Sequence, residues 1–456
     1  MEQSERREAP AAATDSAVPA QKVLQKVPLT PLARSVIATL TIAAIALSVH
    51  QLFNIQLFGI VLIEGRYLYI LAGLFLGMSF LVFPFRPAHG VGLFDWALFA
   101  IALIASSYFV VTAETSLEMG WEYAAPDAAR YTSIILYVLI LEATRRAGGF
   151  TLFLIVFAFS LYPTFADVMP DPLSGYASPF WDLAAYHMIS SESSFGIPMR
   201  AFGNLVIGFI VFGAVLQQTG GGKFFNDLAL ALVGRYRGGA AKVAIFASGF
   251  MGSMSGSVIS NVLTTGAVSI PAMKRTGFSA RHAAATEACA STGGVLMPPI
   301  MGAAALVMAD LTGVGYINII IAALFPALFY YFSLFSAVTV EARRQGIEVQ
   351  PLTVDDKITR IDIINSILFV GPIATVIASL LLGLSTSAAG FYAVVVLLIL
   401  SIINPEVRAK PIRVWNSFIS GSKSGATLLI AIAAIGILVG SLDTTGLGLK
   451  LANVIA

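Results

Sequence analysis

The sequence is short of charged residues. Asp, Glu, Lys and Arg make up 11% of the 456 residues, whereas a soluble domain carries about 25% because water must solvate its surface. Hydrophobic residues make up 57%, and the mean hydropathy is +0.85. Most of the surface must therefore contact lipid or other apolar groups. The net charge of +2 gives no indication of a nucleic-acid partner.

Residues that mark metal, redox or nucleotide sites are scarce. Cys289 is the only cysteine, which excludes a disulfide framework and a CxxC metal site. The four histidines, His50, His89, His187 and His282, lack metal-ligand spacing. The sequence contains no GxxxxGK[ST] loop, HExxH motif or catalytic Ser/His or acidic pair. We therefore predict a protein that is not an enzyme, without a cofactor, and with Na⁺ as the only metal to consider.

Apolar runs long enough to cross a bilayer recur along the chain. Residues 1–34 are polar and are expected to form a disordered cytoplasmic tail. A membrane-spanning helix needs about 20 apolar residues. Such windows lie near 35–55, 66–85, 93–112, 131–145, 150–169, 200–219, 281–310, 316–340, 361–383, 386–404 and 425–442. The predicted fold class is therefore an all-α polytopic membrane protein with about 11 transmembrane helices.

Charge predicts which loops face the cytoplasm, because Lys and Arg concentrate in short cytoplasmic loops. With a cytoplasmic N-terminus, the basic loops carry Arg86, Arg145, Arg146, Lys223, Arg235, Arg237 and Lys242. The acidic loops then fall outside, and these carry Glu114, Glu118, Glu122, Asp127, Asp167, Asp171, Asp182 and Glu192.

Residues 243–273 break this alternation, since basic residues flank them on both sides. We predict a re-entrant hairpin of two half-length helices that enters the membrane and returns to the same face. The segment SGFMGSMSGSVISN at 248–261 supplies small residues for the turn. Irregular backbone at membrane depth persists only where protein or water covers it, so the hairpin is expected to line an internal cavity. The alternative is one tilted span.

A broken helix is predicted at 281–310. Gly293 and Gly294 disfavour a continuous helix, while Pro298 and Pro299 remove backbone donors and clash with the preceding turn. A kinked but continuous helix is the alternative.

A short motif occurs twice. Residues 216–222 read L-x-x-T-G-x-G, and residues 442–448 repeat the pattern. An odd number of predicted crossings separates the copies, which places them in opposite orientations, as in inverted-repeat transporters. The first copy continues through the hairpin and the broken helix, whereas the second ends at Ala456. The chain is therefore expected to be the first half of an inverted-repeat transporter, truncated at its C-terminus.

The two interruptions supply the neutral oxygen atoms that bind cations. A helix end leaves backbone carbonyls or amides without partners, and carbonyl ends favour cations whereas amide ends favour anions. The alternative is that these small residues only let helices pack closely. The predicted cation-binding residues are Ser255, Gly256, Ser257, Asn261, Ser291, Thr292 and Gly293.

A second set of residues is predicted to contact substrate or to take part in coupling. Glu287 lies about one helical turn before the break, and an ionisable group inside a membrane is presumed functional. It is expected to serve proton coupling or to brace the site through hydrogen bonds; the alternative is an interfacial carboxylate paired with Arg281 or His282. The set is Thr264, Thr265, Glu287, Pro298 and Pro299. The aromatic run at 329–332 is typical of an interfacial belt.

Two long segments resemble a known family. GGGKFFNDLALALVGRYRGGAAKVAIFASGFMGSMSGSVISNVLTTGAVSIPAMKRTGF (220–278) and EACASTGGVLMPPIMGAAALVMAD (287–310) are similar to the large membrane subunit of TRAP (tripartite ATP-independent periplasmic) transporters. The TAXI type, in which the small and large membrane subunits are fused, is the closest variant. LEATRR (141–146) and YYFSLFSAVTVEARRQG (330–346) also fit the family. The resemblance covers roughly residues 35–456.

The resemblance implies an elevator-type secondary permease in the bacterial inner membrane. Such a permease receives an organic anion, for example a dicarboxylate or an amino acid, from a periplasmic solute-binding protein and couples uptake to a Na⁺ or H⁺ gradient. The family's ion-site motifs fall on Ser255–Ser257, Asn261 and Ser291–Gly293, with Pro298 and Pro299 fixing the break. Ser260 stands where the family often has alanine.

The implied organisation divides the chain into six segments. These are the tail at 1–34, a small-subunit-like scaffold at 35–170, a periplasmic or interfacial segment at 171–199, the first repeat at 200–345, connecting helices at 346–424 and the incomplete second repeat at 425–456. A separate chain is expected to supply the rest of that repeat. The alternatives are an inactive fragment or membrane scaffold protein without transport, and a related transporter that needs no binding protein.

Overall fold

The computed structural model describes residues 29–56, 61–349, 360–410 and 412–455, and these residues form helices without any strand. Most of the tail expected at 1–34 lies outside the described residues. Eight of the described helices are long and apolar enough to cross a membrane. They are α1 (Pro31–Leu52), α2 (Glu64–Val82), α3 (Leu93–Glu118), the run Asp127–Thr164, the run Ile197–Gly221, α13 (Tyr316–Arg344), the part Ile364–Leu381 of α14, and α17 (Ile412–Thr444).

Eleven spans were expected, and three features account for the difference. The windows 131–145 and 150–169 fall on the two parts of α4 (Asp127–Leu161), which counts as one helix here although its backbone is non-helical at Gly149, with φ 85°. The window 281–310 is divided into two shorter helices. α15 (Thr386–Ser401) has 16 residues, about 24 Å of helix, which is less than the roughly 30 Å of bilayer hydrocarbon.

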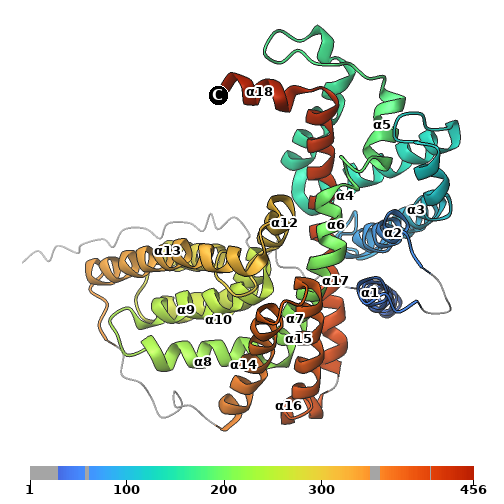
Figure 1. Cartoon of the computed structure of the whole chain (residues 1–456). Helices are drawn as coiled ribbons and strands as arrows, with labels where there is room; N and C mark the ends of the chain where they lie inside the picture. Colours follow the sequence, from blue (N-terminus) through green and yellow to red (C-terminus); the bar gives the residue numbers. More distant parts are fainter. Residues whose placement is uncertain (1–28, 57–60, 350–359, 411, 456) are drawn as a thin grey trace, which may run out of the picture.

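Figure 1 shows the helices in three groups. α1 to α5 (Phe180–Ile189) form one group, in which α2 packs against α3. α7 (Ile207–Leu216), α14 (Arg360–Leu381), α15 and α17 form the second. α8 (Gly222–Val233), α9 (Gly239–Ser255), α10 (Val258–Arg275), α11 (Ala280–Gly294) and α13 form the third, and α8, α9 and α13 run across the direction of α17 in this view. α12 (Ala303–Thr312) lies apart from them and packs against α6 (Ile197–Ala201).

The two copies of the repeated motif end their helices in the same way. The hydroxyls of Thr219 and Thr445 each donate to the carbonyl four residues back, at 2.9 and 2.8 Å. The next residue is in each case a glycine with positive φ, 120° for Gly220 and 68° for Gly446, a conformation that glycine adopts at little cost. A new helix follows each copy, α8 after the first and α18 (Leu447–Ile455) after the second.

These two copies point in opposite directions. α7 packs against α17, and Figure 1 shows α8 leaving at the lower end of this pair while α18 leaves at the upper end. The arrangement agrees with the orientation predicted from the motif and the crossing count. A full inverted repeat stays a prediction.

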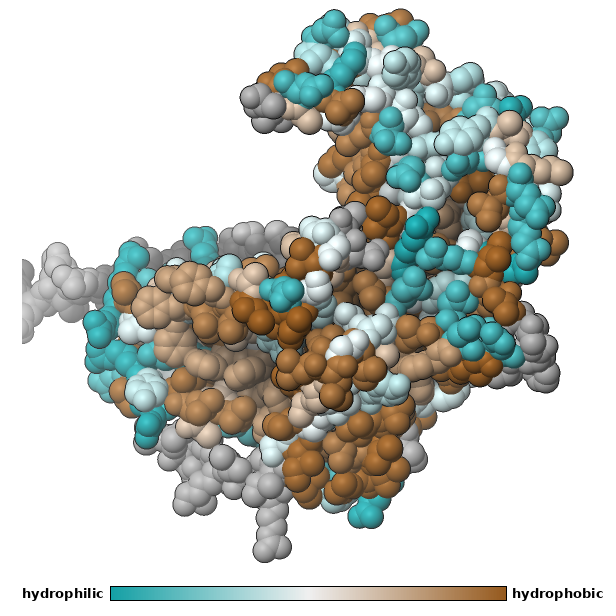
Figure 2. Space-filling model, viewed as in Figure 1, coloured by the Kyte–Doolittle hydropathy of each residue, from teal (hydrophilic) through white to brown (hydrophobic). Residues whose placement is uncertain are grey.

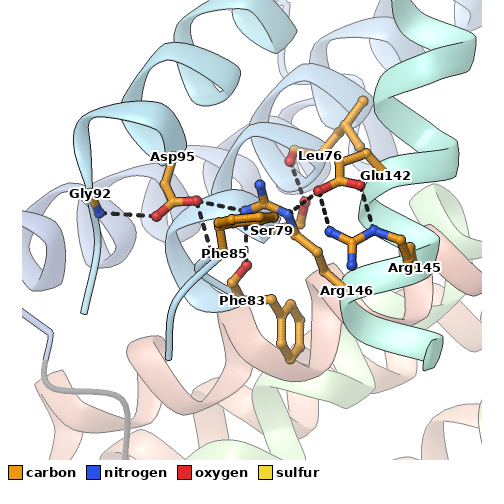
Figure 3. Close-up of polar contacts among 9 residues, drawn as sticks. All are labelled: Leu76, Ser79, Phe83, Phe85, Gly92, Asp95, Glu142, Arg145 and Arg146. Carbon is orange, nitrogen blue, oxygen red and sulfur yellow. Dashed lines mark hydrogen bonds and ion pairs between the residues drawn. The ribbon is translucent and has the colours of Figure 1, made fainter. Parts of the chain in front are cut away.

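Arg145 and Arg146, which were predicted to lie in a loop, are still helical, but they lie shortly before Gly149, where the backbone of α4 leaves the helical conformation. The side chains of Arg146 and Asp95 are only 4% and 3% exposed and form an ion pair at 2.7 Å (Figure 3). Arg146 Nε also donates to Glu142 at 2.7 Å, and Nη1 donates to the carbonyl of Phe83 at 3.2 Å. Two carboxylates thus neutralise a guanidinium that three aromatic rings surround, those of Phe80, Phe85 and Phe94.

Candidate functional site

Two packed helices occupy the position of the predicted hairpin. α9 (Gly239–Ser255) and α10 (Val258–Arg275) contact each other and are joined through Gly256, whose φ is 60°. The chain is therefore not one continuous helix here. The helices have 17 and 18 residues, about 26 and 27 Å, so the expected half-length is wrong. α9 begins directly after Gly238, and α10 ends shortly before Gly277; both glycines have positive φ. Re-entry into the membrane stays a prediction.

The predicted break in the next helix is a full interruption. α11 (Ala280–Gly294) ends, and α12 (Ala303–Thr312) begins only after eight further residues, 295–302. Within the break Met301 has φ 66°, and the amide of Gly302 donates to the carbonyl of Val295 at 2.8 Å. Tyr316 of α13 donates its hydroxyl to the carbonyl of Ile300. A merely kinked helix is thus excluded.

The hairpin turn touches the break. The amide of Met301 donates to the carbonyl of Ser253 at 3.1 Å. A Cβ added at Gly256 would lie 3.1 Å from the Met301 carbonyl oxygen and 3.6 Å from Gly302 Cα. Because Ser257 precedes α10 and Gly302 precedes α12, the N-termini of these two helices meet at this contact.

Close packing explains several of the small residues. A Cβ added at Gly252 would lie 2.6 Å from Gly294 Cα, so α9 and α11 approach backbone to backbone. A Cβ on Gly293, a predicted cation ligand, would lie 2.4 Å from the ring of Tyr330. The hydroxyls of Tyr330 and Tyr331 donate to carbonyls of α11 at 2.8 and 2.9 Å. These two tyrosines therefore brace α11 rather than belonging only to an interfacial belt.

Glu287 lies at the centre of a buried polar cluster formed by α9, α10 and α11. Its side chain is fully buried, and Oε1 accepts a hydrogen bond from Ser248 at 2.6 Å. Thr265 also donates to Oε1, and Ser269 donates to Oε2. Ser291 donates to Oε1 at 3.2 Å. Hydroxyls from α9, α10 and α11 thus converge on one carboxylate.

The hydroxyls of this cluster also contact one another and the backbone. Besides the bonds to Glu287, Ser248 Oγ lies 2.7 Å from Thr265 Oγ1, which is itself 2.8 Å from the carbonyl of Asn261. A hydroxyl donates only one proton, so Ser248 and Thr265 each have more than one possible acceptor for that proton.

The alternative that Glu287 pairs with Arg281 or His282 is wrong. His282 lies near Glu341 instead, at 3.3 Å, and near Ser279 Oγ at 2.8 Å, while Arg281 is exposed. Within the part of the chain that the structure describes, Glu287 forms no ion pair. Its hydroxyl partners lie on the opposite side of α11 from the exposed positions.

The other predicted residues are spread over the hairpin and the break. Asn261 is buried beside the cluster, and its Nδ2 donates to the carbonyl of Ser248 at 2.8 Å. Thr292 is exposed, and its hydroxyl donates to its own helix at 2.8 Å. Thr264 accepts from Gln217 at 2.6 Å. The remaining four are partly buried, namely Ser255 and Ser257 at the turn and Pro298 and Pro299 in the break.

Sequence reasoning missed Ser248 and Ser269. Residues 261, 265 and 269 are spaced by four, which places them on one face of a helix, so Ser269 was detectable once Asn261 and Thr265 were candidates. Ser248 had no comparable signal, because it reaches Glu287 across 39 residues of sequence. The sequence also did not indicate that Gly266 lies against Glu287, although a Cβ there would lie 3.1 Å from Glu287 Cγ.

Comparison with known proteins gives the family. Residues 135–456 match the family described as Tripartite ATP-independent periplasmic transporter, DctM component. This chain belongs to the DctM family. The match includes the hairpin, the break and both motif copies, whereas α1, α2 and α3 precede it. A multi-pass membrane protein of the DctM family is consistent with the eight apolar helices.

Curated relatives within the DctM family align over part of their length. The C4-dicarboxylate TRAP transporter large permease protein DctM of Vibrio cholerae is 30% identical over 148 residues, 32% of each chain. The protein of the same name from Pseudomonas aeruginosa is 30% identical over 143 residues, 31% of this chain and 33% of its own. The 2,3-diketo-L-gulonate TRAP transporter large permease protein YiaN of Escherichia coli is 28% identical over 134 residues, 28% and 29% of the two chains. The chain thus spans about a third of the relatives' length.

Proposed function

We propose that this chain is the permease component of a secondary, ion-driven uptake transporter of the TRAP type for small organic anions. DctM family membership carries the proposal. Three relatives have names that specify carboxylates as their substrates. The proposed setting is the bacterial inner membrane with a cytoplasmic N-terminus. The proposed partner is a periplasmic solute-binding protein.

The contact between the hairpin turn and the break suits an anionic substrate. The N-termini of α10 and α12 meet there, next to Gly256 and Gly302. A helix N-terminus presents free amides and the positive end of the helix dipole, which together favour a carboxylate. We place the substrate's carboxylate at this contact, with Ser255 and Ser257 as further hydrogen-bond partners.

The cluster around Glu287 suits the coupling ion, and we propose that this ion is a proton. The oxygen separations of 2.6 to 2.8 Å are those of O–H···O hydrogen bonds. A proton on Glu287 removes the buried charge, and the surrounding hydroxyls can accept a hydrogen bond from the protonated carboxyl as well as donate to it. The cluster includes residues of α10, and the proposed substrate contact lies at the N-terminus of the same helix. Binding of the proton and binding of the anion therefore both involve α10.

Reconstituted transport tests the proposal. Proteoliposomes that contain the purified chain, together with a chain that supplies the rest of the second repeat, are expected to take up an organic anion such as a C4-dicarboxylate only when its binding protein is present outside. Uptake that needs no binding protein would instead favour a related transporter of another type. Uptake of no organic anion in the presence of binding protein and ion gradients would contradict the proposed function.

A further inference from the structure

An apolar cavity of about 270 Å³ lies between α9 and α13, beside the helix break. Its walls include Phe246 of α9, Phe332 and Phe335 of α13, and Met297 of the break. A Cβ added at Gly249 would lie 3.0 Å from the ring of Tyr331. The cavity shares its wall with the helices that bear the candidate site, yet it contains none of the polar groups of that site.

Two basic side chains lie near Phe335, at one end of this cavity. Lys242 of α9 is only 6% exposed, and its ammonium lies 5.0 Å from the ring centre of Phe335. Arg343, near the end of α13, is close enough to interact electrostatically with Lys242. The ends of the two helices meet, since a Cβ at Gly238 would lie 2.9 Å from the Cβ of Ala342.

The carboxylate that precedes Arg343 on α13 has other partners. Glu341 contacts His282 at 3.3 Å, Gln345 at 2.6 Å and Arg344 at 3.7 Å. Among the residues that the structure describes, neither Lys242 nor Arg343 forms an ion pair. Figure 2 shows apolar side chains over the α8–α13 group and hydrophilic side chains at its outer end, where α13 ends. The site therefore combines an apolar wall with an uncompensated positive end.

We propose that this cavity binds one acyl chain of an anionic phospholipid, with the headgroup phosphate at Lys242 and Arg343. An apolar tail and a negative head are the features that the two ends of the site complement. Basic pockets between membrane helices bind anionic headgroups on the cytoplasmic side, which is the side predicted for the basic loops of this chain. A zwitterionic lipid such as phosphatidylcholine also carries a phosphate, but its choline cation opposes the two basic residues, so an anionic headgroup is favoured. The proposal does not depend on the substrate or the coupling ion.

Quenching by brominated lipids tests the proposal. A tryptophan reporter replaces Phe332 in the cavity wall, and the matched control replaces Phe325, which lies on the same helix, is similarly exposed and does not line the cavity. Each full-length variant is reconstituted with brominated phosphatidylglycerol or brominated phosphatidylcholine. The fluorescence of the native tryptophans is subtracted, using the chain without the reporter.

The expected result is a preference for phosphatidylglycerol at position 332 and none at position 325. Replacement of Lys242 or Arg343 by Gln is expected to lower this preference about fivefold each, from the usual contribution of one basic residue near anionic lipid. Lys242→Arg should retain it. Because Arg343 is exposed, Arg343→Gln remains informative where Lys242→Gln fails to fold. Equal quenching by both lipids at position 332, or a preference that survives both Gln substitutions, would overturn the proposal.

Discussion

Replacing Glu287 by Gln removes the group that we propose to carry the coupling proton. The amide cannot ionise, and it resembles the protonated carboxyl in size. The variant is therefore expected to bind substrate and to exchange it across the membrane. It is not expected to accumulate substrate in response to a pH gradient. Since the cluster provides one carboxylate for one proton, a gradient of one pH unit is worth about 1.4 kcal/mol, or about tenfold accumulation.

The assay follows labelled organic anion in proteoliposomes with the binding protein outside and an acidic exterior. The unsubstituted chain should accumulate substrate about tenfold per unit of pH difference, whereas Glu287→Gln should only equilibrate it. Glu341→Gln is a matched control, because Glu341 is a carboxylate on a neighbouring helix that lies outside the cluster. Accumulation that follows a Na⁺ gradient and ignores pH, or that persists in Glu287→Gln, would refute the reasoning.

Three further predictions concern stability in detergent, measured by thermal or chemical unfolding. Gly252→Ala places a Cβ 2.6 Å from the backbone of α11 and should lower the free energy of unfolding by about 1 to 3 kcal/mol. Gly65→Ala is the control, because a Cβ there has nothing within 4 Å and should not destabilise the chain. Equal effects of the two substitutions would contradict the close contact. Arg146→Ala breaks a buried ion pair and should lower the free energy of unfolding by about 3 to 5 kcal/mol. Arg145→Ala, at a more exposed position, should lower it by at most about 1 kcal/mol. Similar losses in the two variants would argue against the buried network. Burial lowers the pKa of His187 on α5 to about 4, so the unfolded chain binds more protons below about pH 6.5. Stability should therefore fall as the pH drops from about 6.5 to 4, by up to about 1.4 kcal/mol per unit, and a slope unchanged in His187→Gln would show that another group is responsible.

Local interruptions of the helices were predictable from the sequence. Gly256 among small residues gave the turn between α9 and α10, and the Gly-Gly and Pro-Pro pairs gave the break after α11. Both effects act within a few residues, through positive φ and missing backbone donors. Helix lengths were less accessible. α9 begins directly after Gly238, and both arginines stay helical because Asp95 and Glu142 neutralise Arg146, while Glu142 also pairs with Arg145.

The partners of charged groups were not predictable, because they come from distant parts of the chain. Arg146 meets Asp95 across 51 residues, and Glu287 meets Ser248 across 39. Charge counting placed Arg146 in a loop, and for Glu287 it offered a neighbour in sequence only as the alternative partner. In both cases burial favours a partner that provides hydrogen bonds in the folded chain, and sequence spacing reveals such a partner only when it lies on the same helix face, as Ser269 does.

Infrared spectroscopy of the purified chain at neutral pH tests the central claim most directly, since a protonated carboxyl and a carboxylate absorb at different frequencies. The account predicts a carboxylic-acid carbonyl band in the unsubstituted chain that is missing from Glu287→Gln and retained in Glu341→Gln. Spectra of the unsubstituted chain and of Glu287→Gln that differ only in carboxylate bands would show that Glu287 is ionised in its hydroxyl cluster, and would contradict the account.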